Sequence, residues 1–453
     1  MSETAPQNEP ADLAGMRVLL GPGDTASFPT RLARALAEQG AHCWVVNFIP
    51  HRYSAGESKL GNAKLWGAAI ARFASSLNGK GPLGRMLADV IKGLGQFVVF
   101  LWALFRADAI VFVSSRSLLP GYIDLPVYRL LGKRVIRVFL GTDSRPRYMT
   151  GWHNKAVEPN TKAKATEKLA RRVRRQRGRV RFMSRFASVV VENPLCGHYQ
   201  QKPYINWFHV GFPHDPAFFE PTDDDSETTK AQTPGGDESV KVLHCPSNPA
   251  VKGTNRIEAV IDKLKSEGVP IKYTRITGMP HAEVLRRLRH CDLVIDELYS
   301  DSPMAGFASE AVACGKPVIV GGYGWDTLKE QLGEHMAPNL LCVPDDLEET
   351  IRQALDDPQR AKVVGEQAYA FMNGYWHQNE VAKRFAHVLI GRGIPDNWWV
   401  DPATIDYWQG LGATDEHRMA VIKALVETCG IKALGLDPGQ TVYRTIDSWT
   451  EVS

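Results

Sequence analysis

The order of hydrophobic and polar positions along the chain repeats one unit: a short apolar run, a turn, and an amphipathic segment. Short apolar runs between turns are typical of buried strands, and apolar residues three and four positions apart are typical of helices. The first unit has an apolar run at 16–20, the turn GPGDTA at 21–26, a helical pattern at 28–40 and a second run at 41–48. We expect a strand, a turn, a helix and a parallel strand.

The same alternation continues along the rest of the chain. Further strands are expected at 109–115, 133–143, 187–194, 240–247, 271–278, 292–298, 316–322 and 339–346. Helical patterns lie between them and after them, at 125–132, 254–268, 280–291, 306–315, 346–357, 360–375 and 378–391. Strands that alternate with helices predict parallel sheets covered on both faces.

We therefore predict an α/β protein of two doubly wound, Rossmann-like domains that face each other across a cleft. The predicted segments are a disordered tail at 1–15, an N-terminal domain at 16–219, a polar linker or insertion at 220–239, a C-terminal domain at 240–392 and an aromatic-rich, helical extension at 393–453. Open sheets of this kind bind ligands outside the carboxyl ends of their strands, which makes the cleft the expected site.

Composition narrows the class of protein. The 453 residues are 44% hydrophobic and 23% charged, as in soluble globular proteins, and a net charge of +4 is too small for a general polyanion binder. The seven cysteines show no paired spacing, which argues against a disulfide framework and a zinc site and favours a reducing compartment. The polar N-terminus does not have the pattern of a secretory signal. We expect a cytoplasmic protein.

Two segments raise the question of membrane contact. The apolar run FVVFLWALF at 97–105 is shorter than the roughly 20 residues that span a bilayer, so it predicts a buried helix or one that lies at a membrane surface. The basic segment at 162–185 is either a solvated helix face or a patch for anionic lipid or a lipid-diphosphate acceptor. Aromatic residues are sparse in this basic segment, so no nucleic-acid partner is expected.

The stretch SPMAGFASEAVACG at 302–315 places small residues ahead of Glu310 at the start of a predicted helix. The backbone amides of Gly306, Phe307 and Ala308 would lack helical partners there and suit phosphate oxygens. Glu310 can accept hydrogen bonds from a ribose diol, or it can simply favour the start of its own helix. Both interpretations stay open.

Two more loops follow neighbouring strands of the same predicted sheet. In HCPSNPAVKG, Lys252 can meet a phosphate as a point charge, with Ser247 and Asn248 on the same loop, or it is a surface lysine. The loop at Gly278 can hold a planar base by backbone hydrogen bonds. Together the three loops would supply contacts to a base, a ribose and phosphates.

The first domain offers weaker candidates. Gly21 and Gly23 fit the G-x-G-x-x-A pattern of dinucleotide-binding sites. The acidic residue that such a site has after its next strand is absent here. We therefore predict only that this turn lets a ligand approach the backbone closely. Asp143 and Arg145 follow another strand. They either bind a hydroxyl or a phosphate of a ligand, or form a structural pair.

The segments NPAVKG, GMPHAEVLRRLRHCDLVID and GFASEAVACGKPVIV, in this order within 240–390, resemble the donor-binding half of retaining GT-B glycosyltransferases of the family-four type. The resemblance implies transfer of a sugar from a nucleoside diphosphate sugar, with Lys252 on the diphosphate and Glu310 on the ribose. It departs from the family at Ser302, where a second glutamate is common and Asp301 is adjacent. It also departs at Ser247, where an arginine is common.

We therefore expect a glycosyltransferase with Asp143, Arg145, Lys252 and Glu310 as its catalytic candidates. Its donor would be a nucleoside diphosphate sugar, and its acceptor a hydroxyl of a glycan, a lipid-linked sugar or a small molecule. Polysaccharide or glycolipid assembly fits, in the cytoplasm or peripherally at the inner membrane surface. No tightly bound cofactor and no metal are expected. A nucleotide-sugar epimerase and a non-catalytic nucleotide-sugar-binding protein stay open as alternatives.

Overall fold

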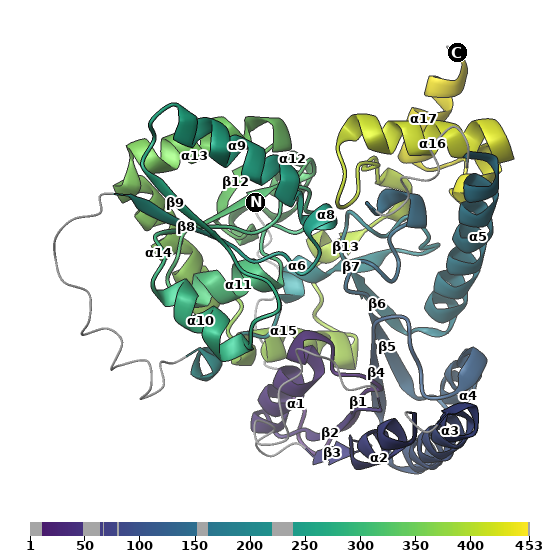
Figure 1. Ribbon diagram of the computed structural model, residues 1–453. Helices are drawn as coiled ribbons and strands as arrows, with labels where there is room; N and C mark the ends of the chain where they lie inside the picture. The colour runs from purple at the N-terminus through teal and green to yellow at the C-terminus, as the bar shows by residue number, and fades with distance from the viewer. Residues whose placement is uncertain are drawn as a thin grey trace, which may run out of the picture. The chain divides into compact units, whose positions relative to one another are not determined.

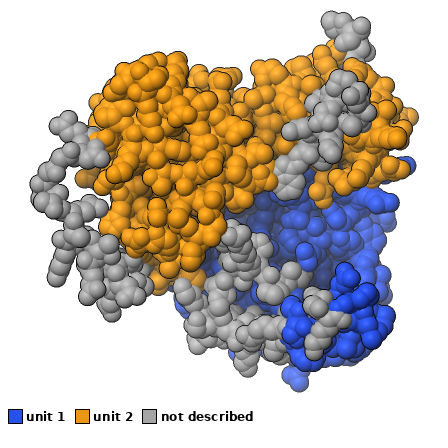
Figure 2. All heavy atoms as spheres, in the orientation of Figure 1, with its two compact units in different colours: residues 1–145, 174–213, 376–405 blue, residues 146–173, 214–375, 406–453 orange. Residues whose placement is uncertain are grey.

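The computed structural model describes residues 11–48, 64–66, 68–78, 81–151, 162–219 and 239–451. The chain divides into two compact units, coloured separately in Figure 2. Unit 1 comprises residues 1–145, 174–213 and 376–405, and unit 2 comprises residues 146–173, 214–375 and 406–453. Each unit has its own sheet flanked by helices (Figure 1), so the predicted class of two doubly wound α/β domains is confirmed.

Unit 1 is built on a sheet of eight strands in the order β13-β7-β6-β5-β4-β1-β2-β3. All pairs are parallel except β13 with β7, which is antiparallel. The strands are β1 (Arg17–Gly21), β2 (His42–Val46), β3 (Lys64–Trp66), β4 (Ala109–Val113), β5 (Arg134–Val138), β6 (Val189–Glu192), β7 (Tyr204–Asn206) and β13 (Trp399–Val400).

The helices of unit 1 cover a sheet whose central strand β4 is apolar throughout. Every residue of β4 is buried, as a strand covered on both faces requires. The helices are α1 (Phe28–Glu38), α2 (Ala68–Asn78), α3 (Gly81–Arg106), α4 (Asp124–Leu130), α6 (Trp207–Val210), α15 (Gln378–Ile390) and, from residue 174 on, α5 (Lys162–Phe186). The predicted apolar run at 97–105 is thus the end of a much longer helix, α3.

Unit 2 carries a parallel sheet of five strands in the order β12-β11-β10-β8-β9. The strands are β8 (Val240–His244), β9 (Ile271–Arg275), β10 (Leu293–Ile295), β11 (Val318–Gly321) and β12 (Leu340–Cys342). The helices are α8 (Pro249–Lys252), α9 (Thr254–Ser266), α10 (His281–Arg289), α11 (Gly306–Ala313), α12 (Trp325–Leu332), α13 (Leu347–Asp356), α14 (Pro358–Gly374), α16 (Asp415–Cys429) and α17 (Thr441–Glu451). Its core joins Ile257 and Ile261 of α9 to Leu293 and Ile319 of the sheet.

The two units are not the contiguous segments that the sequence predicted. Helix α15, expected at the end of the second domain, belongs to unit 1. There the Arg34 guanidinium donates a hydrogen bond of 2.8 Å to Gln378 Oε1, and Gln39 Nε2 donates to the Asn379 carbonyl at 3.1 Å. These hydrogen bonds attach α15 to the region of α1, so this late part of the chain packs in unit 1.

The predicted extension at 393–453 is likewise divided, because its part from 406 on belongs to unit 2. Arg418 of α16 is completely buried and donates hydrogen bonds to the carbonyls of Gln409, Leu411, Tyr148 and Thr150. One guanidinium therefore ties the C-terminal helices to the segment around 150. Long-range contacts of this kind leave no periodic signal in the sequence.

The predicted disordered tail at 1–15 and the predicted polar linker at 220–239 lie mostly outside the described residues. Residues 1–10 and 220–238 are not described. The described end of the predicted tail, 11–15, differs from the expectation. Leu13 is buried, and the Gly15 amide donates to the Gly40 carbonyl at 3.1 Å.

Candidate functional site

The loop after β8 carries Lys252 to the carboxyl edge of the unit 2 sheet. Asn248 caps the short helix α8 by accepting a hydrogen bond of 3.2 Å from the Ala250 amide, and Lys252 ends that helix. The next residue, Gly253, has φ of +74°, and a Cβ there would lie 2.8 Å from Leu298 Cβ. Only glycine therefore lets α8 pack this closely against the segment that follows β10.

Lys252 is held between two carboxylates that directly follow β10. Its Nζ lies 2.7 Å from Asp296 Oδ1 and 3.0 Å from Glu297 Oε2, and its side chain is 13% exposed. Burial disfavours the charge of Lys252, but the attraction of Asp296 and Glu297 outweighs it and raises the Lys252 pKa. Lys252 is therefore charged and paired, which differs from the isolated point charge that the sequence suggested.

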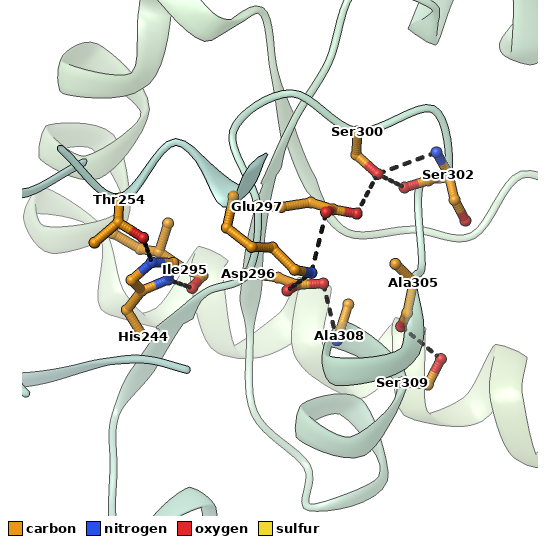
Figure 3. Close-up of polar contacts among 11 residues, drawn as sticks. His244, Thr254, Ile295, Asp296, Glu297, Ser300, Ser302, Ala305, Ala308 and Ser309 are labelled. Carbon is orange, nitrogen blue, oxygen red and sulfur yellow. Dashed lines mark hydrogen bonds and ion pairs between the residues drawn. The ribbon is translucent and has the colours of Figure 1, made fainter. Parts of the chain in front are cut away.

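Asp296 also reaches the start of α11. Its Oδ2 accepts a hydrogen bond of 3.1 Å from the Ala308 amide (Figure 3), while Oδ1 faces Lys252. Of the three amides expected to meet phosphate, that of Ala308 is thus already used by a buried carboxylate. The amides of Gly306 and Phe307 precede it at the helix start, where no intrahelical acceptor exists.

Glu297 also accepts a hydrogen bond from the loop that precedes α11. Ser300 Oγ donates to Glu297 Oε1 at 2.8 Å and accepts from the Ser302 amide at 3.1 Å. Burial raises the pKa of Glu297, while the ammonium of Lys252 lowers it. Ser302, the position of the missing family glutamate, is buried and shapes this loop through its backbone.

Glu310 lies on the exposed side of α11, next to residues from two other loops. Its Oε1 is 3.1 Å from His281 Nε2 at the start of α10, and its side chain is 26% exposed. Cys245 lies on the loop after β8, and its pKa is raised to about 11, mainly by burial and further by the charges of Glu310 and Asp296. The loops after β8, β9 and β10 therefore converge at one edge of the sheet.

His244, at the end of β8, links β8 to β10 and to α9 beneath this edge of the sheet. It is completely buried, its Nδ1 lies 2.8 Å from the Ile295 carbonyl and its Nε2 lies 2.8 Å from Thr254 Oγ1. A carbonyl only accepts, so Nδ1 carries the proton and Nε2 accepts from Thr254 (Figure 3). Burial lowers the pKa of His244, in keeping with a neutral ring.

The remaining candidates of unit 2 lie at exposed positions. Ser247 and Asn248 are exposed on the loop before α8, and Gly278 is exposed in the loop after β9 with φ of +70°. A cavity of about 270 Å³ opens beside α8 in the same unit. Its lining includes Pro249, Gly253, Arg256, Tyr299, Gly412 and His417. The C-terminal segment thus contributes surface next to the loop of Lys252.

In unit 1, the structure supports a packing role for the glycine turn after β1. Gly21 has φ of +152°, and a Cβ there would lie 2.4 Å from the Val46 carbonyl oxygen, so the neighbouring strand β2 requires glycine. Gly23 follows in the same turn, and buried Asp24 accepts hydrogen bonds from the Thr30 amide and hydroxyl. The turn is therefore fastened to α1.

Asp143 and Arg145 lie in the loop after β5, next to a group that the sequence analysis missed. Gln176 Nε2 donates to both of their carbonyls, at 3.1 and 2.8 Å. Glu192, the last residue of β6, is completely buried and accepts a hydrogen bond from Gln200. Burial raises the Glu192 pKa to about 7, the charge of Asp143 adds to this, and Arg145 opposes it. Such a carboxyl can exchange a proton near neutral pH.

Asp296 and Glu297 were missed as well. The available signal was a pair of acids directly after the apolar run LVI, since the end of a buried parallel strand is where ligands and charges gather. Among the described residues, no cluster of His, Cys, Asp and Glu has the arrangement of a metal site.

Comparison with known proteins finds similarity in fold but none in sequence family. No family model matches the sequence, and no curated protein matches it. Among solved structures, the chain is similar to the sucrose-phosphate synthase of Thermosynechococcus elongatus, with a TM-score of 0.50 and 13% identity over 83% of this chain and 98% of that chain. The fold is of the GT-B type.

Weaker similarities extend to other proteins. HepE of Anabaena, solved in complex with UDP and glucose, has a TM-score of 0.47 and 14% identity over 83% of this chain and 100% of its own. A Listeria monocytogenes protein described as a UDP-N-acetylglucosamine 2-epimerase has a TM-score of 0.38 and 13% identity over 85% of this chain and 99% of its own.

Proposed function

We propose that this protein is a glycosyltransferase that moves a sugar from a nucleoside diphosphate sugar to a hydroxyl acceptor. One observation carries the proposal: three loops at the carboxyl edge of the unit 2 sheet bring a paired ammonium, a helix start and a half-buried carboxylate together. These are the groups that a diphosphate and a ribose need. The GT-B fold is a frame on which this reaction is possible, and the groups at the sheet edge are what support the proposal.

In this proposal each group has a distinct task. An ammonium has three N–H donors, of which Lys252 uses two on Asp296 and Glu297, leaving one for a phosphate oxygen. The amides of Gly306 and Phe307 and the dipole of α11 stabilise the charge of the departing diphosphate. Glu310 accepts hydrogen bonds from the ribose hydroxyls. Retention at the anomeric carbon, an acceptor in polysaccharide or glycolipid assembly and a cytoplasmic site are part of the same proposal.

Glu310 is the residue on which to test it, because this side chain is 26% exposed and carries little of the fold. Glu310→Gln keeps the size of the side chain but replaces a charged acceptor of two hydrogen bonds. A hydrogen bond to a charged group contributes about 1.5–3 kcal/mol, and the glutamine amide oxygen can still accept one of the two bonds. We therefore expect nucleoside diphosphate binding to weaken by about tenfold to 100-fold. Calorimetric titration with UDP, GDP and ADP measures the effect.

A matched control is Glu366→Gln on α14 of the same unit, where the side chain is 62% exposed. The control should bind like the wild type. Incubation with the sugar derivative of the best nucleotide then separates the candidate functions, because a transferase gives slow hydrolysis or transfer, an epimerase gives an isomerised donor, and a binding protein gives neither. A wild type that binds no nucleoside diphosphate would contradict the proposal.

A further inference from the structure

Helix α3 of unit 1 exposes a continuous apolar stripe. Its exposed large hydrophobic side chains have exposed fractions between 40 and 77% and are Leu83, Met86, Leu87, Val90, Leu94, Phe97, Val98, Leu101 and Phe105. At about 100° per residue, all of them fall within an arc of roughly 120° along the helix. None of the charged residues of α3 lies in that arc, so the stripe is uninterrupted over some 35 Å.

The opposite face of α3 is packed on unit 1. Its buried residues include Gly84, Ala88 and Gly95, and a Cβ at Gly95 would lie 3.0 Å from the side chains of Phe48 and Ile70. Trp102 packs edge-on against Trp44 of β2, with ring centroids 4.7 Å apart. Small residues thus let α3 lie flat against its neighbours.

By length and composition α3 is apolar enough to cross a membrane, and 28% of its most apolar window is buried. A core helix would be mostly buried, and a spanning helix would have to leave the elements on which α3 is packed. The arrangement fits a third case, a helix that lies in the plane of an interface with one face in the acyl region.

The elements next to α3 carry further exposed apolar side chains. Helix α4 packs directly on α3, since buried Phe100 of α3 contacts buried Tyr128 of α4 with ring centroids 5.5 Å apart, and the two helices lie side by side in Figure 1. Tyr122, just before α4, contacts Phe182 of α5 at 6.4 Å. Further exposed apolar side chains on these elements are Ile123, Leu130, Leu131 and Phe182.

The charge of α5 indicates what covers this surface. Between residues 162 and 186, Glu167 is the only acidic residue, whereas lysine and arginine occur eleven times. Arg175 and Arg185 are exposed, seven positions before and three after Phe182, so they lie on the same side of the helix as that ring. A row of arginines beside an apolar stripe complements anionic headgroups above acyl chains. A symmetric contact between two copies would instead place two arginine-rich helices together.

We propose that this surface of α3, α4 and α5 docks unit 1 onto an anionic lipid bilayer, with the apolar stripe of α3 inserted at the boundary between the headgroups and the acyl chains. The inference does not depend on the proposed function. Full-length protein is mixed with vesicles of phosphatidylcholine containing about 30% phosphatidylglycerol, or with pure phosphatidylcholine, and sedimented. We expect the protein to pellet with the anionic vesicles and to be released as salt rises from about 0.05 to 0.5 M.

The variant Leu94→Glu/Val98→Glu tests the stripe. We expect its partition onto anionic vesicles to fall more than tenfold, because two exposed apolar side chains become charged. Val343→Glu/Val363→Glu, at exposed positions of unit 2, makes the same kind of change elsewhere and should bind like the wild type. Arg175→Ala/Arg185→Ala should weaken binding about fivefold per arginine removed. Circular dichroism without lipid should match the wild type for every variant.

Several results would overturn the inference. A wild type that stays in the supernatant, or a stripe variant that pellets like the wild type, would do so. Light scattering that shows a wild-type dimer split by the stripe variant, without vesicle binding, would make a second copy the occupant. Membrane association that survives alkaline carbonate extraction would mean that α3 spans the bilayer.

Discussion

Replacing Lys252 with methionine is expected to destabilise unit 2 by about 3–5 kcal/mol, whatever it does to activity. The ammonium is the counter-ion of Asp296, which is completely buried, and of Glu297, which is 5% exposed. Methionine keeps much of the volume of the lysine stem but leaves two buried carboxylates facing each other without a cation. Asp296 also accepts a hydrogen bond from the Ala308 amide, so the loss of its counter-ion also destabilises the start of α11.

Urea denaturation of the variant, together with hydrogen exchange of the β10 amides, measures the effect. Lys263→Met on α9 is the matched control, since Lys263 is 56% exposed and pairs with Glu348 at the surface. That control should change stability by no more than about 1 kcal/mol. The triple variant Lys252→Met/Asp296→Asn/Glu297→Gln should recover much of the loss, because neutral amides no longer need a counter-ion. A Lys252 variant as stable as the control would contradict this assignment.

This result bears directly on how the site is tested. Loss of sugar transfer in a Lys252 variant would follow from a disturbed sheet edge as readily as from a lost phosphate contact. A Glu310 variant is free of this ambiguity, because the Glu310 side chain is partly exposed and so is that of His281, its neighbour. Binding measured on Glu310 variants therefore separates donor recognition from the stability of the loops.

The sequence predicted the fold well because its signal is local and periodic. The strand expected at 109–115 contains β4, Ala109–Val113, and the helical pattern at 28–40 contains α1, Phe28–Glu38. The division into units was less predictable, since it depends on contacts such as Arg418 with the carbonyls of Tyr148 and Thr150. Bonds between positions so far apart in the chain leave no pattern in either segment.

The site was predictable in its loops but not in its charge pairing. Glu310, Lys252 and the start of α11 do lie at one sheet edge, as consecutive parallel strands require. Lys252 meets Asp296 and Glu297 only because β8 and β10 are neighbours in the sheet. The hydrophobic pattern of the sequence predicts strands but does not predict their order in a sheet. The same holds for Glu192, whose burial results from the pairing of β6 with β5 and β7.

The stability of unit 1 is expected to fall as pH rises from about 4.5 to about 7, because of Glu192. Burial is the largest influence and raises the pKa of Glu192 from 4.5 to about 7, the Asp143 charge raises it further, and hydrogen bonds from Ser144 and Gln200 oppose the rise. Folded protein therefore keeps a proton that the unfolded chain has lost. Its contribution is fully present below pH 4.5 and is lost by about pH 7, a change on the order of 3 kcal/mol.

Glu192→Gln should abolish this dependence, because a glutamine is neutral in both states and can still accept from Gln200. The variant and the wild type should then be similarly stable near pH 4.5, whereas above pH 7 the variant should be the more stable by about 3 kcal/mol. Calorimetric unfolding of both proteins over this pH range measures the difference. Glu38→Gln, at the exposed end of α1, should follow the wild type throughout. Parallel curves for Glu192→Gln and the wild type would show that Glu192 is ionised in the folded protein, most simply by close pairing with Arg145.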